Sequence, residues 1–123
     1  MPEQEAHRAK AKHNQGFIEK IGDEFADWLA IAAFYKAVHL VEMLRAVKGQ
    51  HSRGHQERNT YLKTKHPIIW VEYYHLYDFS IQARYYCTKI DADKVRYELI
   101  DKRLAALERL VEGEIRKQRR RRA

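Results

Sequence analysis

The sequence is poor in the residues that interrupt or cross-link a chain, with one cysteine, two prolines and five glycines among 123 residues. A single cysteine excludes an internal disulfide. Because Cys87 follows two tyrosines, we interpret it as a small core residue and not as a nucleophile. Scarce glycine and proline favour long helices. The longest apolar run is broken by charges well before the ~20 residues of a membrane span, which predicts no transmembrane helix.

Recognisable targeting and enzyme motifs are also missing. The amino terminus has no apolar stretch behind a basic start, so we expect no secretory or lipidation signal and a cytoplasmic protein. There is no glycine-rich phosphate loop, no helix with paired carboxylates and no nucleophile triad. We therefore expect neither a cofactor nor a bound metal ion.

Positive charge is concentrated at the carboxyl terminus. The formal net charge is +7, and a basic tail at 116–123 supplies most of it, which leaves the rest of the chain close to neutral. The cations of this tail are Arg116, Lys117, Arg119, Arg120, Arg121 and Arg122. Such a run either binds nucleic-acid phosphates by releasing counterions or is a solvated helix end whose cations favour the negative pole of the helix dipole. The sequence leaves both interpretations open.

The spacing of apolar residues predicts an all-α fold. We expect helices at about 4–21, 24–48, 53–65 and 68–88, and a last helix that begins at 91–93. The stretch 24–48 is apolar on almost every side, so it should be the central helix. Short connections make consecutive helices antiparallel. We predict one domain at 1–115, an antiparallel four-to-five-helix bundle, with a basic C-terminal helix extension at 116–123.

Two finer expectations concern helix starts and the last helix. Asp23 and Ser52 have the side chains that cap helix N-termini, and each precedes a predicted helix. The last helix carries one apolar stripe, made of Val95, Leu99, Leu104, Leu107, Val111 and Ile115. A stripe of this kind is typical of a helix with one buried face.

The loop between the second and third predicted helices gathers cations and histidines. Its candidate residues are Arg45, His51, Ser52, Arg53, His55 and Arg58. Arginine forks and the free amides of a helix start bind phosphate oxygens, so we assign phosphate binding to Arg45, Ser52 and Arg53. A histidine with a pKa of ~6.5 can move protons at neutral pH. His51, His55 and Arg58 are therefore the candidate catalytic residues.

Other interpretations of these side chains stay open. Arg58 could pair with a buried carboxylate, such as Glu42 or Asp78, while the loop histidines are solvated. A zinc ion shared by His51 and His55 would find only one further ligand close by in the sequence, a glutamate, and no cysteine pair supports it.

A separate histidine, His39, lies on the predicted central helix. Tyr35 and Glu42 lie on the adjoining turns of the same helix. A structural hydrogen bond to one of these side chains explains a buried histidine better than a catalytic role does.

With these residues in place, the chain resembles the HEPN superfamily of small prokaryotic helical proteins. The resemblance spans about residues 5–112. It rests on an apolar segment with Tyr-Lys-Ala-Val-His-Leu-Val-Glu at its end (27–42), on His-Ser-Arg-Gly-His-Gln-Glu-Arg-Asn (51–59), and on short aromatic segments at 76–78 and 83–85. The resemblance implies a helical bundle that dimerises, with two polar clefts near the interface.

The resemblance also implies a function. Many such proteins are metal-independent endoribonucleases, often toxins or defence effectors, that use an arginine followed by a histidine after four to six residues. Arg45 and His51 match that spacing. We therefore expect a homodimer that binds RNA or nucleotide phosphate, with RNA cleavage as a further expectation. The alternative is a non-catalytic interaction module that pairs with an antitoxin, a nucleotidyltransferase-like protein or another effector.

Overall fold

The computed structural model describes residues 2–86 and 89–122, with side chains for 3–86 and 89–121, and all regular elements among them are helical. The first helices are α1 (Pro2–Lys20), α2 (Ala26–Ala46), α3 (His55–Lys65) and α4 (Pro67–Tyr85). The predicted all-α fold is thus confirmed. The prediction for Cys87 lies outside the described residues.

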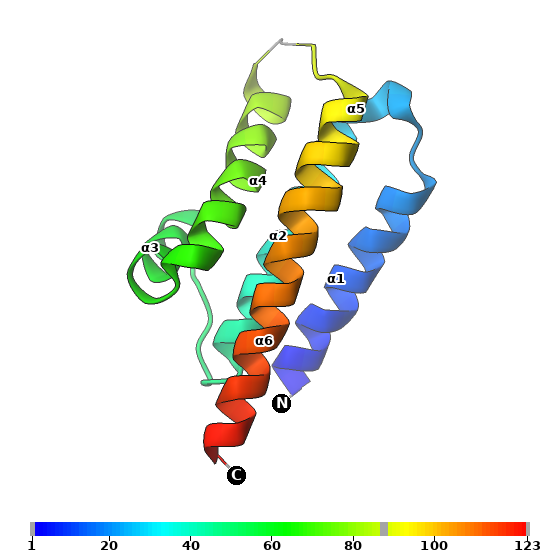
Figure 1. Cartoon of the computed structure of the whole chain (residues 1–123). Coiled ribbons are helices and arrows are strands. Elements are labelled where there is room, and N and C mark those ends of the chain that lie inside the picture. Colours follow the sequence, from blue (N-terminus) through cyan, green and yellow to red (C-terminus); the bar gives the residue numbers. More distant parts are fainter. Residues whose placement is uncertain (1, 87–88, 123) are drawn as a thin grey trace.

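Consecutive long helices run in alternating directions. In Figure 1, α1 rises from the amino terminus, α2 returns, α4 rises again and the last helix descends to the carboxyl terminus. The α2 helix contacts α1, α4 and α6, and the short α3 packs against α4. Ala33, Phe34 and Val41 of α2 are completely buried. The predicted antiparallel bundle with a central second helix is confirmed, and both termini lie at the same end as the α2–α3 loop.

The last helix is continuous but not uniform. It begins as α5 (Ala92–Lys94), continues as the π-helical segment η2 (Val95–Leu104) and ends as α6 (Ala105–Arg122). Asp91 caps its start, since the carboxylate accepts a hydrogen bond from the amide of Asp93 at 2.9 Å. Every residue of the predicted apolar stripe is buried. The basic extension continues α6 in helical form.

The predicted cap of the second helix is wrong. A turn of 3-10 helix, η1 (Asp23–Phe25), precedes α2, and Phe25 occupies the N-cap of α2 without a side-chain hydrogen bond. The carboxylate of Asp23 instead accepts from Nε of Arg96 at 2.7 Å. Asp23 therefore joins the start of α2 to the last helix, which lies far away in the sequence.

Polar contacts fasten α1 to the bundle, because few of its side chains are apolar. Arg8 donates two hydrogen bonds of 3.1 Å to the carboxylate of Glu112 on α6. The buried Lys36 of α2 donates to Gln15 of α1 at 2.9 Å and to Glu108 of α6 at 3.0 Å. These contacts join α1, α2 and α6.

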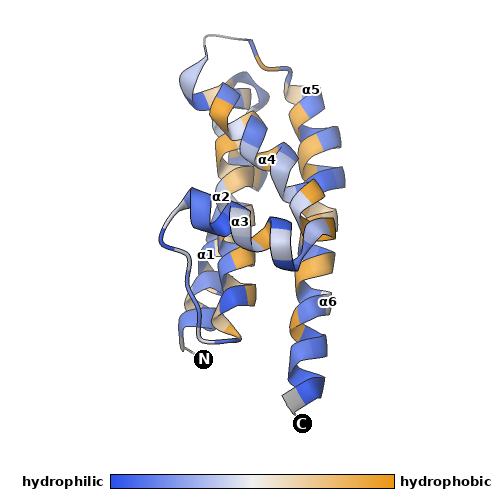
Figure 2. Cartoon of the chain, turned by 90° about the vertical axis from the view of Figure 1, so that its left-hand side faces the viewer, coloured by the Kyte–Doolittle hydropathy of each residue, from blue (hydrophilic) through white to orange (hydrophobic). Residues whose placement is uncertain are grey.

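Hydropathy follows this architecture. In Figure 2, hydrophobic residues alternate with hydrophilic ones along each helix, and the lower part of α6 is almost wholly hydrophilic. Within the described residues, no helix is both long enough and apolar enough to cross a lipid bilayer.

Candidate functional site

A tight turn after α2 sets the course of the loop that carries the predicted site. Gly49 has a φ of 69°, in the left-handed region that glycine adopts without steric cost. The amides of Gly49 and Gln50 donate to the carbonyl oxygens of Ala46 and Arg45, at 3.0 and 3.1 Å. This C-terminal cap ends α2 and lets the loop return along it.

Glu42 is the buried anion to which the loop is attached. Its Oε1 accepts from the amide of Ser52 and its Oε2 accepts from Nε of Arg58, both at 2.8 Å. Burial alone would raise the pKa of Glu42, but the hydrogen bonds from Ser52 and the positive charge of Arg58 outweigh it and hold the pKa below its ordinary value. Glu42 is therefore ionised and fixes the loop and α3 to α2.

The same contact occupies one of the predicted catalytic residues. Arg58 is buried and pairs with the carboxylate of Glu42. This is the alternative interpretation of Arg58 that the sequence left open. Its Nη1 donates to Nδ1 of His55 at 3.0 Å, and the His55 ring packs against Phe34 and Tyr77 with centroids 5.5 and 6.0 Å away. Burial, followed by the positive charge of Arg58, lowers the pKa of His55. His55 and Arg58 thus lie together, with Arg58 buried and His55 partly buried.

The predicted phosphate-binding residues also lie together. Nη1 of Arg45 donates to the hydroxyl of Ser52 at 2.9 Å, and its guanidinium lies 4.4 Å from the centre of the Tyr61 ring. The prediction that Ser52 caps α3 is wrong, because the N-cap residue is Gly54. Glu57 accepts from Arg45 at 3.4 Å and from Arg53 at 2.9 Å.

These residues border an open hollow of about 720 Å³ on the surface of α3. Its lining residues are Arg45, Arg53, Gly54, Gln56, Glu57, Thr60, Tyr61, Thr64 and Lys65. The lining holds three cations against one carboxylate, and it includes neither His51 nor His55. Lys65 is a member that the sequence did not suggest, since a lysine at the end of a short helix is usually a solvated charge. We call this region the phosphate hollow, after the role that the sequence predicts for Arg45 and Arg53.

His51 has a different set of neighbours. It stacks on His7 of α1 with centroids 5.2 Å apart, and its Nε2 is 3.8 Å from Oε1 of Glu3 and 3.9 Å from Oε1 of Glu42. The predicted roles of His51 and His55 stay predictions, but the two rings contact different parts of the bundle. Glu3 and His7 were missed because they belong to a polar helix far away in sequence.

The hydrogen-bond partner of His39 also differs from the expected one. Its Nδ1 lies 2.9 Å from Nδ1 of His7, so one ring donates to the other, whereas we expected a tyrosine or a carboxylate. Burial lowers the pKa of His39 to about 4, with the neighbouring His7 adding to the effect. Burial and His51 lower the pKa of His7. Both rings are therefore neutral at pH 7.

The basic extension lies at the same end of the molecule as the α2–α3 loop (Figure 1). Arg116, Lys117, Arg119, Arg120 and Arg121 are on α6, and Lys117 contacts Glu114 at 3.4 Å. The side chain of Arg122 lies outside those described.

Comparisons with family models, with curated proteins and with solved structures give no match to this chain.

Proposed function

We propose that this chain is a HEPN-like domain that binds RNA through its phosphates, at the phosphate hollow on α3. The observation that carries the proposal is the lining of that hollow, in which Arg45, Arg53 and Lys65 surround an open surface. Two of these three residues belong to the set that the sequence assigned to phosphate binding. Guanidinium and ammonium groups are the side chains that bind phosphate oxygens most strongly.

The start of α3 adds hydrogen-bond donors to these charges. Gly54 and Gln56 line the hollow, and the N-terminus of α3 has no side-chain cap. The amides of a first helical turn have no partner within the helix, and the helix dipole makes them attractive to anions. The hydroxyl of Thr60, in the same lining, can donate as well.

A second hollow extends the basic surface toward α6. It has a volume of about 330 Å³, shares Lys65 with the phosphate hollow, and also contains Arg109 and Lys117. Lys117 belongs to the basic extension. A ligand with several phosphates in a row could therefore contact α3 and α6 together, which favours a nucleic-acid strand over a single nucleotide.

Binding is better supported than cleavage. A general acid or base must reach the reacting oxygen within about 3.2 Å, and the lining of the phosphate hollow includes no histidine. His55 is partly buried and takes its hydrogen bond from Arg58. Metal-independent cleavage by His51 and His55 would require these rings to turn toward the bound strand.

The test is the affinity for a short, fluorescently labelled single-stranded RNA, measured by anisotropy over a range of salt concentrations. We expect the double variant Arg53→Gln and Lys65→Gln to bind about tenfold more weakly. The slope of log affinity against log salt should fall by about 1.4, since each phosphate contact on a single strand contributes about 0.7. Arg45 is left intact because it also supports the loop.

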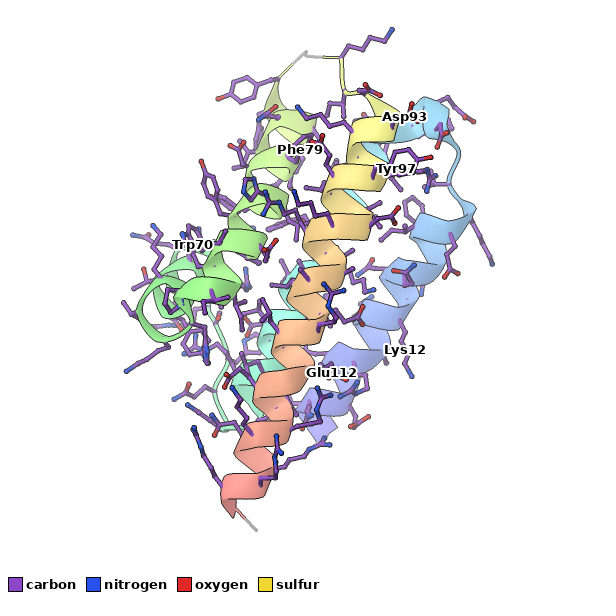
Figure 3. The ribbon with its side chains drawn as sticks, viewed as in Figure 1. Lys12, Trp70, Phe79, Asp93, Tyr97 and Glu112 are labelled. Atoms are coloured by element: carbon purple, nitrogen blue, oxygen red, sulfur yellow. The ribbon has the colours of Figure 1, made fainter. Side chains whose placement is uncertain are left out.

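The matched control removes two exposed cations elsewhere, with Lys12→Gln and Lys20→Gln on α1. Figure 3 places Lys12 on the side of the molecule opposite Trp70 of α4. If the control weakens binding as much as the test variant, binding follows total charge and the hollow is not the site. Tight binding of a mononucleotide that competes with RNA would instead indicate a nucleotide site.

A second candidate function, a protein-interaction module, is favoured by an exposed apolar stripe on α4. Ile68, Val71 and Tyr74 lie on successive turns with 71, 50 and 46% of their surfaces exposed. Contiguous apolar side chains on a surface often mark a contact with another protein. The homodimer implied by the resemblance would use such a stripe.

A further inference from the structure

Three side chains able to bind a metal ion converge beside the α2–α3 loop, outside the phosphate hollow. Glu3 and His7 are one turn apart on the same face of α1, and His51 meets them from the loop. One ligand atom from each residue lies within 4.8 Å of the other two. The His7 and His51 rings are stacked, with an angle of 28° between their planes.

One distance between two of these ligand atoms is close to that of an occupied site. Zinc binds imidazole nitrogen and carboxylate oxygen at about 2.0–2.2 Å, so two ligand atoms on a tetrahedral ion lie roughly 3.3 Å apart. Nε2 of His51 and Oε1 of Glu3 are 3.8 Å apart. A shift of about half an ångström would bring them into position, which side chains that are about half exposed can make.

A further contact orients one of the ligands from behind, and a buried carboxylate lies near another. Nδ1 of His7 is 2.9 Å from Nδ1 of His39, so if His7 uses Nε2 for a metal, its other nitrogen keeps a hydrogen bond. Metal-binding histidines almost always have such a partner. Glu42 lies 3.9 Å from Nε2 of His51 and is itself fixed by Arg58. The buried carboxylate adds negative charge beneath the cluster.

The cluster is open on one side. The Glu3 and His51 side chains have 47 and 49% of their surfaces exposed, so an ion can enter from solvent. Three protein ligands and an accessible fourth position are the arrangement of zinc sites that keep a water molecule.

We propose that Glu3, His7 and His51 bind one divalent transition-metal ion, of which zinc is the best match. Two imidazoles disfavour Mg²⁺ and Ca²⁺, which prefer oxygen ligands, and the absence of a thiolate from the cluster fits a borderline ion. The sequence did not predict this site, since we expected no metal, and the zinc alternative paired His51 with His55. The bound ion joins the first turns of α1 to the α2–α3 loop, and therefore stabilises the end of the bundle at which that loop lies.

The test uses the whole chain after metal removal with a chelator, titrated with Zn²⁺ alone in a buffer that does not bind metals. We expect one ion per chain by calorimetry. With free zinc at a hundred times the dissociation constant, the thermal midpoint should rise by roughly 8 °C. Glu3→Gln and His51→Gln, both at half-exposed positions, should each weaken zinc binding at least about tenfold.

The matched control is His13→Gln, which removes an exposed histidine from the same helix. It should leave stoichiometry and affinity unchanged. Equal binding by the wild type, Glu3→Gln and His51→Gln would overturn the proposal, as would a loss in His13→Gln as large as in His51→Gln. Circular dichroism of the metal-free variants separates a lost ligand from a lost fold.

The ion itself is identified by competition. Co²⁺ bound at this site should give the strong visible absorption of a tetrahedral centre, and Zn²⁺ should displace it. Ni²⁺ and Cu²⁺ should bind more tightly than Co²⁺, which is the general order of affinities for divalent metal ions. Such a result does not change the assignment of the ligands. Displacement by Mg²⁺ at similar concentration would contradict the donor set. RNA affinity measured in chelator is independent of this outcome.

Discussion

Nε of Arg58 donates to Oε2 of Glu42 at 2.8 Å, and the two side chains expose only 7 and 2% of their surfaces. This ion pair joins α3 to the central helix. Taking one charge out of a buried pair leaves the other unpaired, which costs about 3–5 kcal/mol. The pair therefore governs whether α3, and with it the phosphate hollow, keeps its position.

We expect Arg58→Met to lower the free energy of unfolding by about 3 kcal/mol, because the Glu42 carboxylate keeps only the amide of Ser52 as a partner. Adding Glu42→Gln to the same chain should recover a large part of the loss. Urea denaturation of both variants checks this. A loss below about 1 kcal/mol in Arg58→Met would mean that the carboxylate is solvated in the folded chain.

Stability should fall on acidification from about pH 6.5, and His66 should contribute. Burial lowers the pKa of His66, with Lys48 adding to the effect and Glu114 opposing it. Its Nε2 lies 3.1 Å from the Tyr61 hydroxyl. Because its pKa is higher in the unfolded chain than in the folded one, unfolding takes up a proton as the pH falls through 6.5 and below.

The check is the unfolding free energy of the wild type and His66→Gln between pH 8 and pH 5, in chelator. The decline below about pH 6.5 should be shallower in the variant. The exposed His13→Gln serves as the control and should decline as the wild type does. A steeper decline in His66→Gln would contradict the direction of the shift.

The basic extension should contribute to RNA affinity in proportion to its charge. The test variant is a truncation that removes residues 116–123 and keeps Ile115, which is buried. If every cation in this segment contacts the strand, the salt slope should fall by about 4. Replacing all six cations by glutamine at full length should give the same loss without shortening α6. An unchanged salt slope would indicate that the extension is a solvated helix end that does not contact the RNA.

The apolar stripe on α4 predicts self-association. We expect Ile68→Ser combined with Val71→Ser to shift the chain from dimer to monomer in light scattering after size-exclusion chromatography. Tyr97→Ser removes a comparably exposed side chain, and Figure 3 places Tyr97 on the opposite side from Trp70 of α4. If the wild-type chain is monomeric at high concentration, the predicted homodimer is excluded. The stripe would then be expected to contact a different protein.

The helices and their buried faces could be predicted because local periodicity determines both. Phe34 and Val41 lie where the apolar pattern of the central helix placed them, and so does Ile115. The spacing of the last helix also indicates its π-helical segment. Leu99 and Leu104 are five residues apart, which suits the wider turn of a π-helix.

The site could be predicted only in part, because its contacts join distant parts of the chain. Arg45, Arg53 and Ser52 are close in sequence, and their proximity followed from the loop. His7 and His51 meet only because α1 packs antiparallel to α2, and nothing in the polar sequence of α1 specifies which of its residues faces the loop. The predictions of the two helix caps were wrong for a similar reason, since the side chains of Asp23 and Ser52 have hydrogen-bond partners elsewhere in the fold.

The π-helical segment η2 accommodates one more residue than a regular helix would need between the same two buried positions. Deleting the exposed Asp101 would set Leu99 and Leu104 four residues apart and allow ordinary α-helical hydrogen bonding. The chain length at this point can therefore change by one residue while the sequence on either side keeps its packing against the central helix.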